Sequence, residues 1–193
     1  MTDTSRETSE KKAPSFWSEV FSILLNALII SGLVLIINYF FFANVKVDGA
    51  SMEPTLHDTD RLILNKMSNL ERFDIVVFPA PDNEKDKYIK RIIGIPGDRI
   101  EYREDKLYLN GEYIEEKYLP DYSESDSLYY ATGNFSLQSL LGTEVVPEGK
   151  YFVLGDNRMN SRDSREFGFV DGDAMVGKVV FRYWPFDQFG VVD

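Results

Sequence analysis

The chain has 193 residues, 44% of them hydrophobic and 27% charged, with a formal net charge of −11. This balance is that of a globular protein, and the acidic charge argues against nucleic acid as a partner, because phosphate binding needs clustered Lys and Arg. The sequence has no cysteine and one histidine, His57. Disulfides, thiolate nucleophiles and histidine-rich metal sites are therefore excluded, and we expect neither a metal nor a cofactor.

The N-terminal part divides into a polar tail, residues 1–18, and an apolar segment. The run Val20–Ala43 has 24 residues and no charge, enough to cross a hydrocarbon layer of about 30 Å. Its length argues against a buried core helix, and the lack of a small-residue cleavage site argues against a removed secretory signal. We therefore predict a transmembrane signal anchor over residues 19–43.

Charges on either side of this segment indicate its orientation. Arg6, Lys11 and Lys12 precede it, whereas only Lys46 and Arg61 follow within about 20 residues. The positive-inside rule then favours a cytoplasmic N-terminus. The expected protein is a single-pass protein of the cell membrane with its C-terminal domain, residues 44–193, outside the cytoplasm.

Residues 44–193 are expected to be mainly β. Short β-branched and aromatic runs are separated by turn residues; they are ANVKV, DRLILN, FDIVVF, YIKRIIGI, DRIEYR, KLYLN, YFVLG and GKVVFRYW. Glu104-Asp105 and Asn110-Gly111 are placed to close two hairpins. The polar, tyrosine-containing stretch 115–147 is expected to be a small inserted subdomain or surface loop. The predicted fold is an N-terminal transmembrane helix followed by an antiparallel β domain.

Three polar patterns within this domain could carry chemistry. Ser51 follows Gly49 and Ala50, a glycine-containing turn that suits a nucleophile and suits a surface turn equally well. Lys90 lies among apolar neighbours in a strand; such a lysine usually extends to solvent, but burial would lower its pKa and let it accept a proton from a serine. The loop after the strand at residues 151–154 is dense in Asp, Asn, Arg and Ser, and could hold a neighbouring side chain in place.

Taken together, three strings resemble the conserved boxes of bacterial type I signal peptidases of the Gram-positive kind, in order and spacing. They are GASMEPTL from Gly49, KRIIGIPGD from Lys90 and GDNRMNSRDSR from Gly155; RFDIVVF and FRYWPF match as well. The resemblance implies the antiparallel β fold that these enzymes share with the SOS-repressor proteases. It also implies a membrane-anchored serine endopeptidase that removes signal peptides from secreted preproteins after small-x-small motifs.

The resemblance also implies roles for individual residues. Ser51 would be the nucleophile and Lys90 the general base, with Ser161 hydrogen-bonded to the lysine and with Asp163 and Arg165 as supporting groups. The Ser51 N–H would stabilise the oxyanion. Some relatives add a side-chain hydroxyl two residues before the nucleophile, but that residue is Gly49 here, so a second donor stays open. No motif of the family uses His57, although it lies near Ser51.

Substrate contacts are expected at apolar residues near the two catalytic positions, each of which could equally be ordinary core. They are Val45, Val47, Met52, Leu56, Tyr88 and Ile89. Ser51 lies eight residues beyond Ala43, so at ~3.3 Å per residue it can be at most about 26 Å from the span. The expected partners are therefore preproteins, membrane lipid and the protein export machinery.

Two other functions fit parts of this pattern. A self-cleaving repressor would share the serine and lysine, but the apolar segment, the acidic charge and the lack of a helix-turn-helix argue against it. A membrane-anchored β domain that only binds a partner would be favoured if Lys90 were solvated and far from Ser51.

Overall fold

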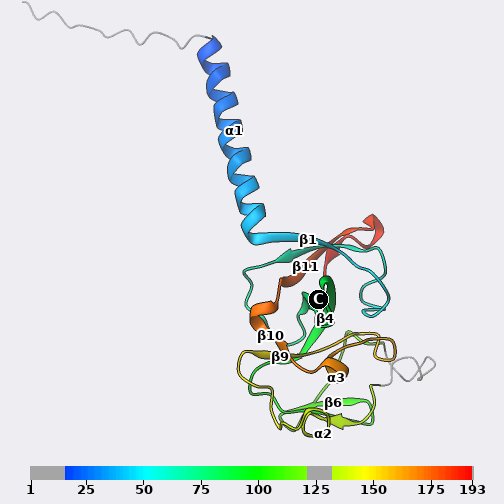
Figure 1. Cartoon of the computed structure of the whole chain (residues 1–193). Coiled ribbons are helices and arrows are strands. Elements are labelled where there is room, and N and C mark those ends of the chain that lie inside the picture. The colour runs from blue at the N-terminus through cyan, green and yellow to red at the C-terminus, as the bar shows by residue number, and fades with distance from the viewer. Residues whose placement is uncertain (1–15, 121–131, 193) are drawn as a thin grey trace, which may run out of the picture. The chain divides into compact units, whose positions relative to one another are not determined.

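The computed structural model describes residues 16–120 and 132–192. The chain divides into two units, Met1–Phe40 and Phe41–Asp193 (Figure 1). Helix α1, Phe16–Phe41, makes up the described part of the first unit. Residues 16–18, expected in the tail, are thus helical, and the rest of the predicted tail lies outside the described residues. The helix ends two residues before Ala43, because Phe42 already pairs with Asn65 as a strand.

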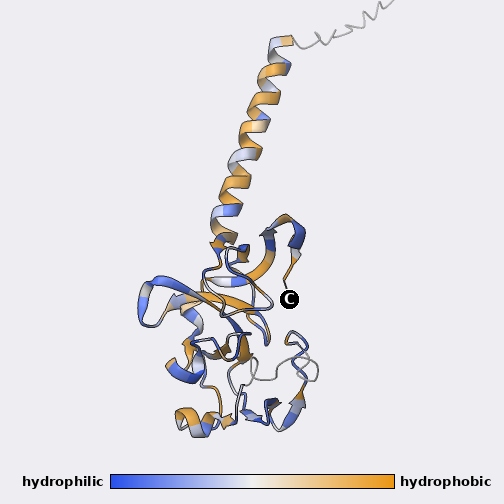
Figure 2. Ribbon diagram, turned by 90° about the vertical axis from the view of Figure 1, so that its right-hand side faces the viewer, coloured by the Kyte–Doolittle hydropathy of each residue, from blue (hydrophilic) through white to orange (hydrophobic). Residues whose placement is uncertain are grey.

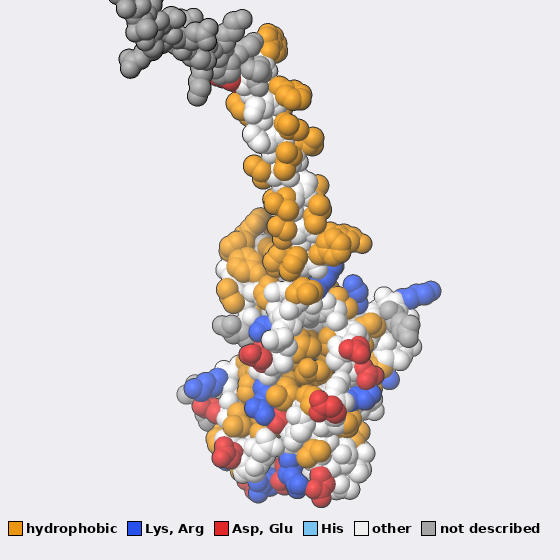
Figure 3. Space-filling model, turned by 90° about the vertical axis from the view of Figure 1, so that its left-hand side faces the viewer, with side chains coloured by type: hydrophobic (Ala, Val, Ile, Leu, Met, Phe, Trp, Pro, Cys, Tyr) orange, Lys and Arg blue, Asp and Glu red, His pale blue; other side chains and the backbone are white. Residues whose placement is uncertain are grey.

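The part of α1 from Glu19 to Phe41 is long and apolar enough to cross a membrane. Its 23 residues correspond to roughly 34 Å of helix. Hydrophobic residues occur along and around the whole helix (Figures 2 and 3), and the described structure buries none of its apolar window. A helix that is apolar on all sides and exposed is typical of a membrane span.

The second unit contains two antiparallel sheets. The larger has the strand order β1-β2-β11-β3-β4-β9-β10, with β12 paired to β11. Its strands are β1 (Phe42–Lys46), β2 (Arg61–Asn65), β3 (Ile75–Ala80), β4 (Asn83–Gly94), β9 (Lys150–Leu154), β10 (Val170–Asp171), β11 (Gly177–Trp184) and β12 (Gly190–Val191). The long strand β4 lies between β3 and β9, so both its edges are paired near its C-terminal end.

The smaller sheet has the order β7-β6-β5-β8. Its strands are β5 (Ile100–Arg103), β6 (Lys106–Leu109), β7 (Glu112–Ile114) and β8 (Phe135–Ser136). Both predicted hairpins are confirmed: Glu104 and Asp105 have φ of 50° and 60°, and Asn110 and Gly111 have φ of 55° and 89°. Two consecutive residues with positive φ match the right-handed twist of the flanking strands.

The described part of the segment 115–147 extends the smaller sheet. Strand β8 pairs with β5 and leads into α2, Leu137–Leu141. Residues 121–131 of the predicted inserted subdomain lie outside the described residues. The remaining short elements are α3, Ser164–Phe167, and the 3₁₀ turns Gly172–Ala174 and Phe186–Gln188.

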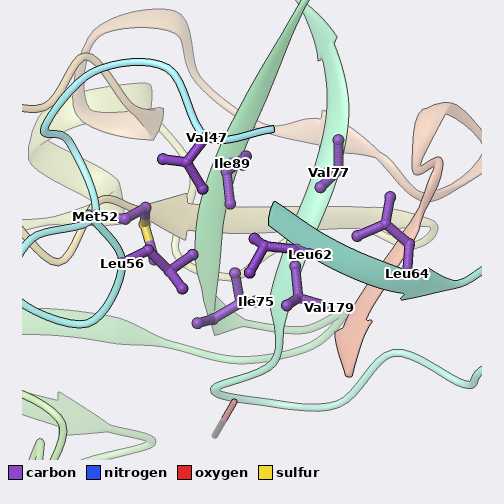
Figure 4. Packing of buried hydrophobic residues seen from close by; sticks show 9 residues of the cluster. All are labelled: Val47, Met52, Leu56, Leu62, Leu64, Ile75, Val77, Ile89 and Val179. Atoms are coloured by element: carbon purple, nitrogen blue, oxygen red, sulfur yellow. The ribbon is translucent and has the colours of Figure 1, made fainter. Parts of the chain in front are cut away.

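One core cluster lies directly beside the turn that carries Ser51. Met52 and Leu56, from that turn, are 1% and 0% exposed and pack with side chains of β2, β3, β4 and β11 (Figure 4). Burying a side chain of this size contributes about 2 kcal/mol. The part of the turn that follows Ser51 is therefore fixed by the core of the domain.

Candidate active site

Ser51 lies on the turn between β1 and β2. Gly49 begins the turn with φ of 89°, a backbone conformation that strains any side chain larger than hydrogen. The Gly49 N–H donates to Asp58 Oδ1 at 3.0 Å, and the Leu56 N–H donates to the Met52 carbonyl at 2.9 Å. These bonds close the turn on both sides of Ser51, while Met52 and Leu56 anchor it in the core.

Lys90 lies on β4, opposite Val76 of β3, and only 3% of its surface is exposed. Its Nζ lies 2.7 Å from Ser51 Oγ, as a hydrogen-bond donor to that oxygen. Burial lowers the pKa of Lys90 from 10.5 to about 8, against the opposing effect of the Asp163 and Asp156 carboxylates. A lysine that loses its proton near pH 8 can take the proton of the serine it contacts.

The expected supporting residues Asp163 and Arg165 form an ion pair where the loop after β9 runs into α3. Arg165 Nε and Nη2 donate to the two carboxylate oxygens of Asp163, each at 2.8 Å. Asp163 is fully buried, accepts the Gly155 N–H at 3.1 Å and caps α3. The pair therefore fixes the start of the loop relative to its end.

A second buried ion pair connects this loop to β4. Arg91, the residue after Lys90, donates to Asp156 through Nε at 3.0 Å and through Nη2 at 2.8 Å. Thr55, on the Ser51 turn, donates to the same carboxylate at 2.6 Å. Asp156 thus links the strand of the lysine to the turn of the serine, a role that the sequence pattern did not reveal.

Ser161 lies beside these groups, but the expected hydrogen bond to Lys90 is not present. Its Oγ is buried and has no hydrogen-bond partner among the described residues. A Cβ on Gly155 would lie 2.1 Å from this oxygen and 2.5 Å from the Ser51 carbonyl. The Ser161 hydroxyl therefore occupies space that the missing side chain of Gly155 leaves open, next to the Ser51 backbone.

A groove of about 240 Å³ lies over Ser51 and Lys90. Val47, Met52, Tyr88 and Ile89, four of the six expected substrate contacts, line it. Val45 and Leu56 are not among its lining residues and pack only with the core cluster, to which Val47, Met52 and Ile89 also belong. The lining also includes polar residues that the sequence did not single out, namely Lys46, Asp48, Lys87 and Arg162. Arg162 contacts Asp82 of the β3–β4 turn, so this rim depends on a tertiary contact between distant segments.

The second hollow, His57 and the acidic residues offer no comparable catalytic arrangement among the described residues. A larger hollow of about 630 Å³ lies over the smaller sheet, but its two serines bond each other in the cap of α2, and no lysine is among its described lining residues. His57 is exposed. Within residues 16–120 and 132–192, no group of three or more His, Asp or Glu could hold a metal ion.

Comparison with known proteins shows the family to which the chain belongs. Residues 20–184 match the family described as signal peptidase, peptidase S26. The chain is 51% identical over 154 residues to signal peptidase I of Bacillus caldolyticus, covering 78% of this chain and 84% of the relative. It is 41% identical over 179 residues to signal peptidase IB of Staphylococcus aureus strain COL, covering 89% and 93%.

A solved structure is similar as well. The crystal structure of a signal peptidase I from Enterococcus faecalis V583 is 44% identical, with a TM-score of 0.53, and the match covers 57% of this chain and 97% of that one. The mainly antiparallel β fold expected from the sequence is thus confirmed. The chain belongs to the signal peptidase I family, peptidase S26, and is a serine endopeptidase.

Proposed function

We propose that this chain removes N-terminal signal peptides from secreted preproteins after small-x-small motifs, with Ser51 as nucleophile and Lys90 as general base. The observation that carries the proposal is the 2.7 Å contact between Lys90 Nζ and Ser51 Oγ, made by a lysine that is almost fully buried. Family membership and this contact favour a protease over a domain that only binds a partner.

The reaction follows the logic of a serine nucleophile with an adjacent base. Neutral Lys90 takes the Oγ proton as Ser51 attacks the scissile carbonyl carbon, and the carbonyl π electrons move to the oxygen. The resulting ammonium gives its proton to the leaving amine as the peptide C–N bond breaks. Water, deprotonated by Lys90, then hydrolyses the acyl-enzyme.

The supporting residues hold this pair in place. Asp163 and Arg165 fix the loop that packs against Ser51, and Gly49 closes the turn. We infer that Ser161, whose hydroxyl is buried without a partner, serves as a hydrogen-bond partner of Lys90 once Ser51 Oγ has moved onto the substrate. The apolar residues Val47, Met52, Tyr88 and Ile89 would border small side chains of the substrate in the groove.

The proposed arrangement in the cell is a cytoplasmic tail over residues 1–18, an anchor over 19–43 and an external catalytic domain over 44–193 that includes the insertion 115–147. Membrane lipid and the export machinery are its proposed neighbours. Because the chain has no cysteine, single cysteines can report the orientation. A membrane-impermeant maleimide should label Glu148→Cys in intact cells and leave Thr4→Cys unlabelled until the cells are permeabilised; the reverse result would contradict the orientation.

The test of the activity uses the full chain in detergent with a preprotein that ends its signal in Ala-x-Ala. Wild type should cleave it once, after the second alanine. Ser51→Ala and Lys90→Ala should be inactive, while Lys85→Ala, which removes an exposed lysine of the same strand, should match the wild type. Cleavage by either of the first two variants would contradict the assignment of the pair.

A further inference from the structure

The backbone N–H of Ser51 is an unused donor at the site. Among the described residues it donates to no protein acceptor, whereas the neighbouring Gly49 N–H is engaged by Asp58. Gly49 therefore contributes neither a side-chain hydroxyl nor its own N–H to an oxyanion. The direction of the Ser51 N–H then matters more, because a donor stabilises a developing charge only when it is already aimed at it.

One peptide plane sets that direction. The Ala50 carbonyl and the Ser51 N–H belong to the same planar peptide unit and point to opposite sides of it. The Ala50 carbonyl accepts two hydrogen bonds, from Asn157 Nδ2 at 3.1 Å and from the Glu53 N–H at 3.2 Å. Donors on the carbonyl hold the plane and polarise the amide, which strengthens its N–H as a donor.

The next peptide plane is held by the same residue. The Asn157 backbone N–H donates to the Ser51 carbonyl at 3.1 Å. Asn157 therefore contacts the peptide units on both sides of the Ser51 Cα, from a position more than 100 residues along the chain. Ser51 cannot rotate about its own backbone without breaking one of these two bonds.

The two residues just before Asn157 are held by buried groups. The Gly155 carbonyl accepts a hydrogen bond from Arg158 Nε at 2.9 Å, and the Gly155 N–H donates one to Asp163. Asp156, which lies between Gly155 and Asn157 in the sequence, is paired with Arg91, the neighbour of Lys90. The loop segment that ends in Asn157, which bonds to the backbone around Ser51, is thus fixed to β4, the strand that carries Lys90.

We propose that the side-chain amide of Asn157 aims the Ser51 N–H at the oxyanion, which makes Asn157 a positioning residue. The inference rests on the proposed function. It differs from a merely structural role, in which Asn157 would tie two loops together. A structural tie affects folding and all ligands alike, whereas an aimed donor affects only species that carry negative charge on the oxygen.

The experiment compares two peptides with the same small-x-small sequence, one ending in an aldehyde and one in the corresponding alcohol. Ser51 Oγ adds to the aldehyde carbon, its proton passes to Lys90, and the carbonyl π electrons form an oxyanion; the alcohol cannot react. The measured quantity is the ratio of the two dissociation constants, with the full chain in detergent. This ratio does not depend on the fraction of folded protein.

Asn157→Leu keeps the size of the side chain and removes its donor, while the backbone N–H remains. We expect the preference for the aldehyde to fall by about 10- to 100-fold and alcohol binding to change by less than about twofold, with a matching loss in kcat and little change in KM. If this variant does not fold, Asn157→Ala, which removes the donor without adding a charge, takes its place. Asn160→Ala, an exposed asparagine in the same loop, is the matched control and should match the wild type.

Equal weakening of both peptides in the Asn157 variants, or an unchanged ratio, would overturn the inference. A failure of the proposed function looks different. In that case wild type itself would bind the aldehyde no more tightly than the alcohol, and Ser51→Ala would make no difference.

Discussion

Lys90 and Arg91 are neighbours on one strand and are buried to nearly the same degree, with 3% and 1% of their surfaces exposed. Adjacent strand residues point to opposite faces of a sheet, so the two cations have different surroundings. Arg91 contacts the buried carboxylate of Asp156. Lys90 forms no ion pair within the described part of the chain, and its Nζ contacts Ser51 Oγ instead.

Under the proposed function, this difference separates a structural cation, Arg91, from a catalytic one, Lys90. Beside a carboxylate, a buried cation keeps its charge and fixes the segments that it joins. With carboxylates acting only at longer range, burial dominates, and the pKa of Lys90 falls to about 8. The strand therefore carries the proposed base and its structural support in consecutive residues.

The largest expected effect comes from making position 90 resemble position 91. In Lys90→Arg the cation is retained, but a guanidinium keeps its proton throughout the working pH range and cannot serve as a base. We expect kcat to fall at least about 1,000-fold in single-turnover cleavage of the preprotein. Retention of a tenth of the wild-type rate would mean that the reaction needs a positive charge at position 90 and does not need a residue there that can lose its proton.

Removing the partner of Arg91 tests the structural half of the comparison. Asp156→Asn leaves a buried guanidinium without its carboxylate, which costs about 3–5 kcal/mol in the free energy of unfolding. Denaturant unfolding of the full chain in detergent measures this loss. The control is Glu144→Gln in the exposed pair with Arg99, where we expect a change below about 1 kcal/mol. Similar losses in both variants would remove the distinction between buried and exposed pairs.

The buried lysine should make the wild type less stable than a variant without it. The pKa of Lys90 is about 8 in the folded chain and 10.5 when unfolded, so the unfolded state binds more protons and stability rises with pH between these values. Lys90→Met should therefore be more stable than wild type by about 3 kcal/mol at pH 7, and the gain should vanish by about pH 10.5. Unfolding curves at several pH values measure it. A gain that is independent of pH would point to packing instead.

The smallest expected effect concerns the hydrogen bond that joins the turn of Ser51 to Asp156, the partner of Arg91. Thr55→Val removes the hydroxyl that bonds Asp156 and keeps the shape of the side chain, so we expect a loss of about 1 kcal/mol in unfolding free energy. Thr55→Ser retains a hydroxyl and should recover most of it. A larger loss in the serine variant than in the valine variant would show that packing, and not the hydrogen bond, matters here.

Local signals in the sequence predicted much of the fold. The hairpins at Glu104-Asp105 and Asn110-Gly111 follow from residues that tolerate positive φ, and the longer strands from runs of β-branched residues. The two-residue strands β8, β10 and β12 are too short to show a period. Helix α3 did carry a signal, since Asp163 is a suitable N-cap, but a four-residue helix has no apolar stripe to accompany it.

The candidate site was predictable in its main residues and not in its connections. Ser51 and Lys90 were identified from motifs that resemble a known family. The links through Asp156 and Asn157 join positions 65 to 107 residues apart, and no local pattern specifies which carbonyl or guanidinium such side chains reach. For the same reason, only the structure reveals that Ser161 Oγ has no hydrogen-bond partner among the described residues.

The most direct test of the central claim is the pH dependence of acylation by wild type. Lys90 must be neutral to accept the proton of Ser51, and its pKa is about 8. Single-turnover rates with a preprotein substrate should therefore rise with pH through a midpoint near that value and fall about tenfold for each pH unit below it. A rate that stays flat from about pH 5 to 9 would contradict a lysine base.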